Sequence, residues 1–522
     1  MVSVASCRSC QYGISGGWRS HPPEIPICPM MAGKREAREF HRYTVSNMSL
    51  KTTFIYPGIA GRGWNSLKQG MDAGWISHGL ASLSAAAQAQ GFEVDLIDLR
   101  ALSGWDQFRA VLAERAPDVI GVTIMSVDYN PARQAIAIAK EVLPDVVAVI
   151  GGPHVTIALQ DSLRIPHVDY LVTGEGEITF PQLLRAIAEG RRPSHRVLRG
   201  EPPDLDAIPF SDRDLFLEEW KKWGYDLDSP EVPFVEELPP PFATIIAGRG
   251  CIYNCTFCKP GEDYLFGKRV RRRSVDNVLA ELRYLVDRYR LASFMFHDDC
   301  LTEDREWVME FTERYIAEGF NLPFFCQTRA DIVVKHEDMV ERMVRAGLRG
   351  YFIGFESGSD RVLKFIRKGT TVAQNLEAAR ICKKYGIAIW ANYMMGLPTE
   401  TKEEVMETVR MMKEIDPDYY SPAFFTPHPG TDLYDFVVEH DLSRITDYDS
   451  YRRNPTEPKI RGQDYEFLRW AMAESQRRKP WNAFRRWTRR QWRRIRRVTP
   501  AKVLRRLGIG VRSALAVRCG GL

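Results

Sequence analysis

The 522-residue sequence predicts an α/β protein with two parallel sheets followed by a basic helical tail. Short, almost continuously apolar strands alternate with helix-length segments, and this alternation occurs twice, over 52–190 and over 242–426. Such alternation is typical of parallel sheets covered by helices. Arginine and aromatic residues dominate the last part of the chain, which predicts the tail. The length leaves room for two or three domains.

The first set of strands predicts a doubly wound, Rossmann-like sheet. The predicted strands are 52–56, 94–97, 119–124, 146–150 and 168–172. Ligands of such sheets bind beyond the carboxyl ends of the strands. The loops at those ends are rich in glycine and small polar residues, among them Thr123, Ser126, Gly151 and Gly152. We therefore expect a ligand to bind at this edge.

The second set predicts six βα units, which can form a partial barrel that is open on one side. The predicted strands are 242–247, 293–297, 324–327, 350–354, 387–394 and 419–425. Polar or glycine-rich residues follow several of them, including Asp299, Arg329, Glu356, Gly396 and Pro398. Singly, the polar side chains also fit helix N-caps. Together they predict a ligand-binding rim, because barrel active sites lie at the carboxyl ends of the strands.

Three cysteines follow the first strand of the predicted barrel, in the run Cys-Ile-Tyr-Asn-Cys-Thr-Phe-Cys over 251–258. At this spacing Cys251, Cys255 and Cys258 can converge on one soft metal centre, and thiolates are the usual ligands of iron–sulfur clusters. Three protein ligands for a cluster of four irons leave one iron open to another ligand. A zinc knuckle is the alternative, but zinc sites usually add a second Cys or His pair, and none follows closely.

The spacing, the apolar strand before it, the flanking glycines and the aromatic Phe257 resemble the radical S-adenosylmethionine (SAM) superfamily. The resemblance implies a [4Fe-4S] cluster on the three cysteines, with Phe257 beside the cofactors. SAM would chelate the open iron through its methionine amino and carboxylate groups. One electron from the cluster would break the C–S bond of SAM and give a 5′-deoxyadenosyl radical, which abstracts hydrogen from an unactivated carbon. An electron donor such as flavodoxin or ferredoxin is implied.

The same resemblance implies roles for the polar rim of the barrel. Glu356 matches the polar residue after the fourth strand that contacts SAM in the superfamily. Arg329 and Asp299 are candidates for contacts with the carboxylate and ribose of SAM. Gly396 and Pro398 would let the backbone approach the adenine.

The first sheet resembles the cobalamin-binding domain that precedes many radical SAM domains. Gly151 and Gly152 match the close approach of backbone to the nucleotide tail of the cofactor, and Thr123 and Ser126 fall where that family lines the tail pocket. Many cobalamin proteins carry Asp-x-His-x-x-Gly after the first strand, and the His ligates cobalt. Here the loop over 57–64 has no His, so the resemblance implies cobalamin without a histidine ligand. A Rossmann-like domain that has lost the cofactor is the alternative.

Cobalamin beside a radical SAM site implies a C-methyltransferase. An anaerobic oxidative cyclase acting on a porphyrin-like substrate, as in bacteriochlorophyll biosynthesis, uses the same two domains, and fold alone does not decide between them. A third hypothesis is an RNA- or protein-modifying radical SAM enzyme. The fourth is a cluster or cobalamin sensor, against which the polar rim of the barrel argues.

The composition indicates a folded protein of the reducing cytoplasm. Hydrophobic residues make up 44% of the chain, no apolar stretch reaches the ~18 residues of a membrane span, and the N-terminus lacks a signal-peptide pattern. Ten cysteines in 522 residues do not suggest a dense disulfide framework. The net charge of +5 hides an asymmetry, since 16 of the 72 Lys and Arg residues lie within 477–522, where no Asp or Glu occurs.

The basic tail has an amphipathic pattern over 481–498. At helical spacing one face carries Trp481, Phe484, Thr488, Trp492 and Ile495. Arginines cover the rest, which predicts peripheral association with an anionic membrane surface. Nucleic acid is the rival partner, and a solvated tail is the third possibility. A membrane-docked enzyme implies a hydrophobic, lipid-like small-molecule substrate.

These patterns also predict where the domains begin and end. We expect an unstructured N-terminal extension over 1–47, a cobalamin-binding domain over 48–195, a linker over 196–240, a radical SAM domain over 241–460 and a basic amphipathic tail over 461–522. For the first 47 residues, a small metal-binding extension and a true start at Met48 are alternatives.

Overall fold

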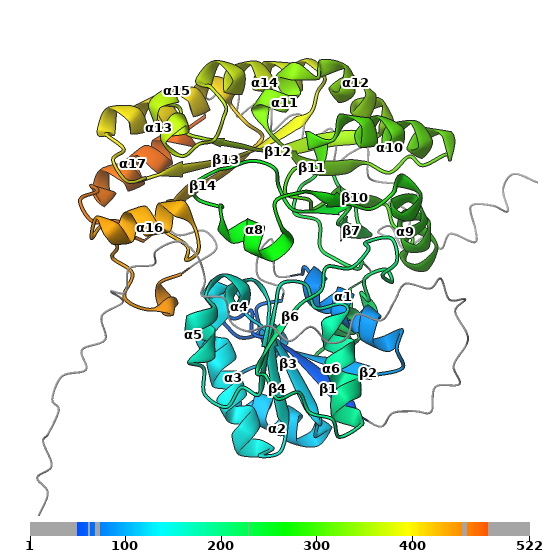
Figure 1. The fold of residues 1–522 in the computed structure, drawn as a ribbon. Helices are drawn as coiled ribbons and strands as arrows, with labels where there is room; N and C mark the ends of the chain where they lie inside the picture. Colours follow the sequence, from blue (N-terminus) through cyan, green and yellow to red (C-terminus); the bar gives the residue numbers. More distant parts are fainter. Residues whose placement is uncertain (1–49, 61–62, 68–73, 228, 452–456, 479–522) are drawn as a thin grey trace, which may run out of the picture.

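The computed structural model describes residues 50–60, 63–67, 74–227, 229–451 and 457–478. These residues form two α/β units, the first below the second in Figure 1. The extension over 1–47 and the amphipathic segment over 481–498 lie outside the described residues. No helix among the described residues combines the length and the hydropathy that crossing a membrane requires.

The first unit is built on a six-stranded, entirely parallel sheet in the order β2-β1-β3-β4-β5-β6. Its strands are β1 (Lys51–Tyr56), β2 (Glu93–Asp98), β3 (Val119–Thr123), β4 (Val147–Gly151), β5 (Tyr170–Thr173) and β6 (Val197–Arg199). The five predicted strands are confirmed to within two residues at each end. The sixth was not predicted, because β6 has three residues and none of them is fully buried.

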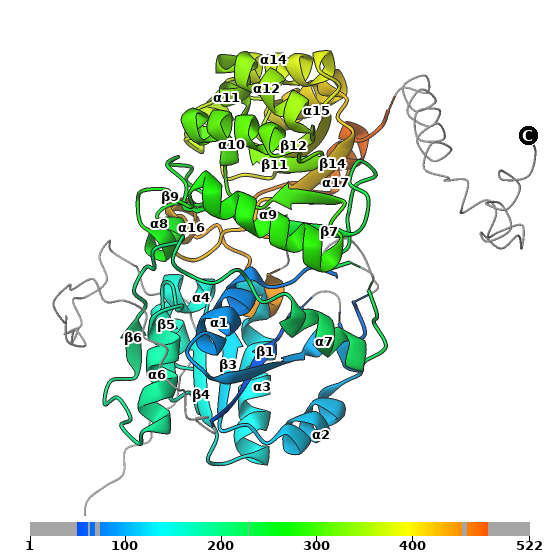
Figure 2. The same ribbon diagram turned by 90° about the vertical axis from the view of Figure 1, so that its right-hand side faces the viewer.

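Helices cover both faces of this sheet, as a doubly wound fold requires (Figure 2). Phe54 packs with the core on one face and its neighbour Ile55 with the core on the other. The first face is covered by α1 (His78–Gln88), α6 (Thr179–Ala188) and α7 (Asp214–Lys222). The second is covered by α2 (Trp105–Arg115), α3 (Tyr129–Val142), α4 (Pro153–Ile157) and α5 (Leu159–Leu163), with short 3-10 turns η1 (Leu99–Ala101) and η2 (Ser126–Asp128) between the elements.

Part of the segment 196–240, predicted as a linker, packs on the first sheet. Strand β6 pairs with β5. Helix α7 is anchored by the fully buried Trp220, whose indole Nε1 donates a 2.8 Å hydrogen bond to Asp98 at the end of β2. Further along, Val235 and Leu238 pack with Phe242, at the start of the second unit. The segment therefore contacts both units.

The second unit is a six-stranded parallel sheet in the order β14-β13-β12-β11-β10-β7, with β7 and β14 at its two edges. Its strands are β7 (Phe242–Ile245), β10 (Ser293–Phe296), β11 (Phe324–Thr328), β12 (Leu348–Glu356), β13 (Ala388–Met395) and β14 (Tyr419–Phe424). All six predicted strands are confirmed. The sheet arches into the predicted partial barrel, and helices cover its outer side (Figure 1).

Six of the barrel helices named below start at a side chain that caps them: α9, α10, α14, α15, α16 and α17. Thr371 and Thr401 form capping boxes at two of these starts, which satisfy free backbone N–H groups there. The helices are α9 (Val275–Tyr289), α10 (Arg305–Ala317), α11 (Ala330–Lys335), α12 (Glu337–Ala346), α13 (Asp360–Phe365), α14 (Val372–Lys384), α15 (Lys402–Ile415), α16 (Asp432–Glu439) and α17 (Tyr465–Ser475), with the 3-10 turns η3 (Leu301–Glu303) and η4 (Tyr448–Ser450). Helix α17 lies within the predicted tail and packs on the barrel. The hydroxyl of its Ser475 lies 2.6 Å from the hydroxyl of Tyr393 on β13.

The cysteine loop leaves the barrel through a small hairpin. Strands β8 (Gly248–Arg249) and β9 (Arg271–Arg272) pair antiparallel and close a loop that holds α8 (Gly261–Phe266). Residues 248–272 are called the cluster hairpin below. Helix α8 lies between the two sheets in Figure 1, which places the cluster hairpin at the junction of the units.

Candidate active site between the two sheets

A cavity of about 920 Å³ lies between the carboxyl ends of the two sheets. Both units contribute to its wall, and so does the segment that connects them. Seven predicted site residues line this cavity: Thr123, Ser126, Gly151, Gly152, Phe257, Cys258 and Asp299. The predicted edge of the first sheet and the predicted cysteine loop therefore face the same space.

Gly152 allows the ends of β3 and β4 to approach closely. Its φ is +97°, and a Cβ there would lie 2.7 Å from Thr123 Oγ1 and 3.0 Å from the Ile124 nitrogen. The Ile124 N–H donates a 2.8 Å hydrogen bond to the Gly151 carbonyl. A side chain at Gly152 has no room, so the glycine pair forms a backbone surface at the cavity wall, the kind of surface to which a flat or extended ligand can bind closely.

Ser126 is held by a buried histidine. Its hydroxyl lies 3.0 Å from His154 Nδ1, and the His154 ring packs against Tyr129 and Tyr448. Burial lowers the pKa of His154 to about 4, so the ring is neutral at pH 7. Tyr448 follows the barrel in the chain and donates a 2.5 Å hydrogen bond to Asp161 of the first unit. This cluster therefore joins the two units beside the cavity.

The first histidine after the loop that follows β1 is His78, and it is engaged with the barrel. His78 lines the cavity, and its Nε2 lies 2.6 Å from Thr244 Oγ1 on β7. Burial lowers the pKa of His78 well below its usual value. Its ring is therefore neutral, and Nε2 already has a partner in the second unit.

The three cysteines lie on the cluster hairpin, where backbone hydrogen bonds shape the loop. The N–H groups of Cys258 and Lys259 both donate to the Cys255 carbonyl, at 3.0 and 2.9 Å, and the Lys259 ammonium donates to the Cys251 carbonyl at 2.7 Å. Cys255 is buried, whereas Cys258 faces the cavity. Three thiols on one loop are the donor set that an iron–sulfur cluster takes.

The thiols must still turn toward a common point when a cluster binds. Among the described residues, no three His, Cys, Asp or Glu side chains are gathered as ligands around one position. The loop between Cys251 and Cys255 is neither helix nor strand, so rotation about the cysteine side chains can bring the sulfur atoms together. The residues fit a [4Fe-4S] cluster, with Cys258 on the side of the cavity.

Asp298 and Asp299, adjacent in the chain, do different things. Asp298 is buried and accepts a 3.0 Å hydrogen bond from the Ala247 N–H, which ties the end of β7 to the end of β10. Asp299 faces the cavity. Burial, and to a lesser degree the neighbouring Glu262 carboxylate, raise the pKa of Asp299 to about 7. Both carboxylates line the cavity. Asp298 also joins the two strand ends, and the contact of Asp299 with SAM stays a prediction.

Arg329 and Glu356 lie beside the cluster hairpin and do not line the cavity. Arg329 donates a 2.6 Å hydrogen bond to the Lys368 carbonyl, and its guanidinium carbon lies 3.6 Å from the ring centre of Tyr253, between two of the cysteines. Glu356 pairs with the Lys368 ammonium at 2.8 Å, and that ammonium lies 6.0 Å from the ring centre of Phe257. Both predicted residues are therefore engaged with side chains that support the cysteine loop.

Gly396 and Pro398 form a buried turn outside the cavity wall. The N–H groups of Gly396 and Leu397 both donate to Glu400 Oε2, at 2.7 and 3.1 Å. A Cβ on Gly396 would lie 2.9 Å from Leu468 on α17. The close approach that requires this glycine is thus to helix α17.

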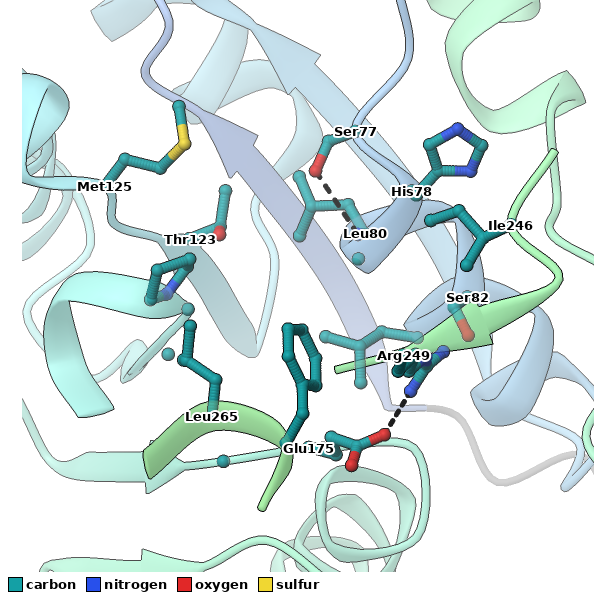
Figure 3. Close-up of a pocket in the computed structure, with 18 of the residues that line it drawn as sticks. Ser77, His78, Leu80, Ser82, Thr123, Met125, Glu175, Ile246, Arg249 and Leu265 are labelled. Atoms are coloured by element: carbon teal, nitrogen blue, oxygen red, sulfur yellow. Dashed lines mark hydrogen bonds and ion pairs between the residues drawn. The ribbon is translucent and has the colours of Figure 1, made fainter. Parts of the chain in front are cut away.

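The sequence patterns did not single out four charged residues that line or border the cavity. Arg249, next to the cysteine loop, pairs with Glu175 at 2.5 Å and with Glu177 at 2.7 Å. Arg271 also pairs with Glu175. Figure 3 shows Arg249 and Glu175 meeting at the edge of the cavity. The sequence signals that could have identified these residues are the Gly-Glu-Gly-Glu loop over 174–177 and the arginine run over 271–273. Neither signal shows that the two segments, which belong to different domains, form ion pairs with each other.

Comparisons with known proteins agree with this geometry. A radical SAM superfamily model matches residues 245–412, and a B12 binding domain model matches residues 73–184. An uncharacterized methyltransferase of Pyrococcus horikoshii is 30% identical over 390 residues, which are 72% of this chain and 81% of that protein. An anaerobic magnesium-protoporphyrin IX monomethyl ester cyclase of Rubrivivax gelatinosus is 29% identical over 425 residues, covering 77% of this chain and 72% of the cyclase.

A solved structure shares the fold. The radical SAM methyltransferase TsrM from Kitasatospora setae, solved with cobalamin and a [4Fe-4S] cluster bound, matches with a TM-score of 0.56 at 20% identity over 75% of each chain. Both domain models and the Pyrococcus horikoshii relative point to one family. The chain belongs to the cobalamin-binding radical SAM superfamily, as a methyltransferase-like enzyme with a [4Fe-4S] cluster, SAM and cobalamin as its cofactors.

Proposed function

We propose that this enzyme methylates an unactivated carbon of a hydrophobic, lipid-like substrate. The observation that carries the proposal is the shared cavity, because Gly151 and Gly152 of the cobalamin-binding sheet and Cys258 of the cluster hairpin line the same space. When bound, SAM and the cluster supply a 5′-deoxyadenosyl radical and cobalamin supplies the methyl group. A substrate carbon held in this cavity is within reach of both.

The chain's own residues bind the cofactors and exclude water. Cys251, Cys255 and Cys258 hold the cluster, and the backbone at Gly151 and Gly152 gives cobalamin a surface without side chains. Radical chemistry needs a dry site that keeps the reactive carbon in place. The apolar part of the wall supplies this environment, through Leu205, Ile208, Phe210, Leu265 and Phe266.

The same apolar wall supports a hydrophobic substrate, and the sequence of the tail supports a membrane source for it. The segment over 481–498 has aromatic residues on one helical face and arginines on the others, a pattern typical of helices that lie in the membrane interface. Peripheral membrane association through this segment is part of the proposal.

A one-electron donor is also part of the proposal, and the surface beside the cysteines fits an acidic carrier such as flavodoxin or ferredoxin. Ile252, between two of the cysteines, is 55% exposed. It borders a shallow hollow of about 430 Å³ that Lys268 and Arg269 also line, and both of these cations are exposed. Arg272, Arg305, Glu303, Asp304 and Glu306 also line this hollow, so cations outnumber carboxylates there by one. An exposed apolar contact beside the two exposed cations is suited to a carrier with acidic groups around its redox centre.

The experiment that tests the methyltransferase is reconstitution under anaerobic conditions followed by methyl transfer. The full chain is loaded with iron, sulfide and cobalamin, reduced, and incubated with methyl-labelled SAM and a lipid extract. We expect four irons and one cobalamin per chain and label in the lipid fraction. The Cys255→Ala variant, which lacks one cluster ligand, is the matched control. Absence of label from every lipid fraction, with both cofactors bound, would contradict the lipid methyltransferase.

The second candidate is an oxidative cyclase, which the 29% identity to the Rubrivivax gelatinosus protein favours. Magnesium-protoporphyrin IX monomethyl ester separates the two functions. A cyclase forms a new ring on this compound with no label from SAM in the product, whereas a methyltransferase leaves it unchanged or transfers label to it.

A further inference from the structure

Arg249 connects the two sides of the cavity wall. It is the last residue of β8 and stands two positions before Cys251. One guanidinium nitrogen, Nη1, lies 2.5 Å from Glu175, and the other, Nη2, lies 2.7 Å from Glu177. Both carboxylates follow β5 of the cobalamin-binding sheet. The rigid fork of an arginine can hold two carboxylates at once, which a lysine ammonium does with less geometric control.

The loop that carries the two carboxylates is itself held by neighbouring residues of the first unit. The Ser82 hydroxyl of α1 donates a 2.9 Å hydrogen bond to Glu177. The N–H of Gly174 donates to Thr156 Oγ1 at 2.9 Å. Gly200, after β6, packs so closely that a Cβ there would lie 2.0 Å from the Glu175 carbonyl oxygen. The loop over 173–177 is therefore a rigid partner for the arginine.

The second strand of the cluster hairpin also contacts the Glu175 carboxylate. Arg271 is the register partner of Arg249 across the hairpin, and its guanidinium pairs with Glu175. The next residue, Arg272, turns the other way and pairs with Glu303 at 2.7 Å in the barrel. The base of the cluster hairpin is thus held on one side by the cobalamin-binding sheet and on the other by the barrel.

We propose that Arg249 is a positioning residue that sets the distance between the cluster and cobalamin. The inference rests on the proposed function, in which both cofactors act on one substrate carbon in this cavity. Arg249 is neither a thiol ligand nor part of the glycine pair, but its two ion pairs join the strand that leads into Cys251 to the loop after β5. Removing them leaves the thiols and the glycine pair in place and loosens the strand before Cys251 from the first unit, while the pair between Arg271 and Glu175 remains.

The test measures that placement directly, without a substrate. In the reconstituted and partly reduced full chain, the reduced cluster and cob(II)alamin each carry an unpaired electron, and their dipolar coupling in electron paramagnetic resonance reports the separation. For the wild-type protein we expect one narrow distribution of cluster–cobalt distances. For Arg249→Gln we expect a distribution at least twofold broader, with unchanged iron and cobalamin content. Arg249→Lys, which keeps one charge but loses the fork, should fall between them.

A matched control removes another arginine pair near the domain junction. Arg288 of α9 pairs with Asp214 of α7 at 2.6 Å, far along the chain from the cysteines and outside the cavity wall. Arg288→Gln should retain the wild-type distribution. Hydrogen exchange of the cofactor-free chain adds a second readout, because Arg249→Gln should accelerate exchange in 173–177 and 248–251 together.

The possible results separate a positioning role from a purely structural one and from the failure of the proposed function. A wild-type distance distribution in Arg249→Gln, with both cofactors bound, would overturn the inference whether or not methyl transfer is found. If Arg249→Gln loses its cluster, the double variant Glu175→Gln with Glu177→Gln is measured in its place, since it removes both partners of Arg249 and keeps the arginine beside the cysteines. An unchanged distribution in that variant would overturn the inference equally, and a broader one would support it.

Discussion

Replacing Gly152 by alanine tests whether the glycine pair forms the cobalamin surface. The backbone at Gly152 has φ +97° and ψ −178°, a region that essentially only glycine occupies and that costs other residues about 1–3 kcal/mol. The added Cβ would also lie 3.0 Å from the Ile124 nitrogen and 3.1 Å from the Ile124 oxygen. Rotation of the Thr123 side chain does not relieve these backbone contacts, and overpacking of this kind costs about 1–3 kcal/mol.

The two terms together predict a local destabilisation of about 2–6 kcal/mol, or at least about thirtyfold more frequent opening of the ends of β3 and β4. Hydrogen exchange of peptides over 122–126 and 150–156 measures this opening, because the N–H groups of Ile124 and His154 are hydrogen-bonded across the junction, at 2.8 and 2.9 Å. Cobalamin retained after gel filtration measures the consequence for the site. We expect Gly152→Ala to lose most of its cobalamin.

Alanine substitutions at two other glycines separate the cost of backbone strain at Gly152 from the cost of its close contacts. Gly190 has φ +69°, and a Cβ added there would have nothing within 4 Å of it, so Gly190→Ala carries only the backbone strain of about 1–2 kcal/mol. Gly151 has no positive φ, and its Cβ would lie 3.3 Å from the Val172 carbonyl oxygen, so Gly151→Ala should perturb the strand ends less than Gly152→Ala. Wild-type exchange and full cobalamin in Gly152→Ala would refute the reasoning.

Three further predictions concern the cluster, its reduction and the response to acid. Cys255→Ala should lower the iron content from about four per chain to near zero, measured with labile sulfide, because three thiolates are needed for the cluster. Lys268→Glu combined with Arg269→Glu should slow reduction of the cluster by flavodoxin about tenfold at low salt, while reduction by dithionite stays unchanged. Burial lowers the pKa of His154 to about 4, so between pH 6.5 and 4 the unfolded state binds a proton that the folded state does not. Stability should therefore fall as the pH falls through that window, by up to about 3 kcal/mol, and thermal unfolding of His154→Gln should lose this part of the pH dependence.

The sheets could be predicted because their strands are apolar along their whole length. Strand β3 lies between two other parallel strands and is covered on both faces. Such strands are short runs of consecutive apolar residues, whereas a helix on the surface of a sheet alternates apolar and polar residues with a period of 3.6. Strand β6 has three residues and no fully buried one, so it carries no such signal. Helix α7 stands between proline-rich and acidic stretches in the sequence, and tertiary contacts assign it to the first unit, among them the hydrogen bond of Trp220 to Asp98 and the ion pair of Glu219 with Arg115.

The site was predictable where one short segment carries it. Cys251, Cys255 and Cys258 are close in the chain, and the glycine pair follows directly from a strand. The parts that were not predictable depend on residues far apart in sequence. At Gly396, the described contact that requires a glycine is with Leu468, and the expected approach of the backbone to the adenine of SAM stays a prediction. Arg249 and Glu175 meet from different domains, and no local pattern reports such a pair.

The cavity belongs to neither sheet alone, because the segment between the two domains supplies part of its wall. The residues that hold the cofactors come from strand-end loops and the cluster hairpin, whereas Leu205, Ile208 and Phe210 come from the segment between the domains. Side chains in that segment can change without disturbing the thiols or the glycine pair, since they lie on neither sheet. Two relatives, one named as a methyltransferase and the other as a cyclase, are each about 30% identical to this chain, so the shared fold alone does not fix the reaction.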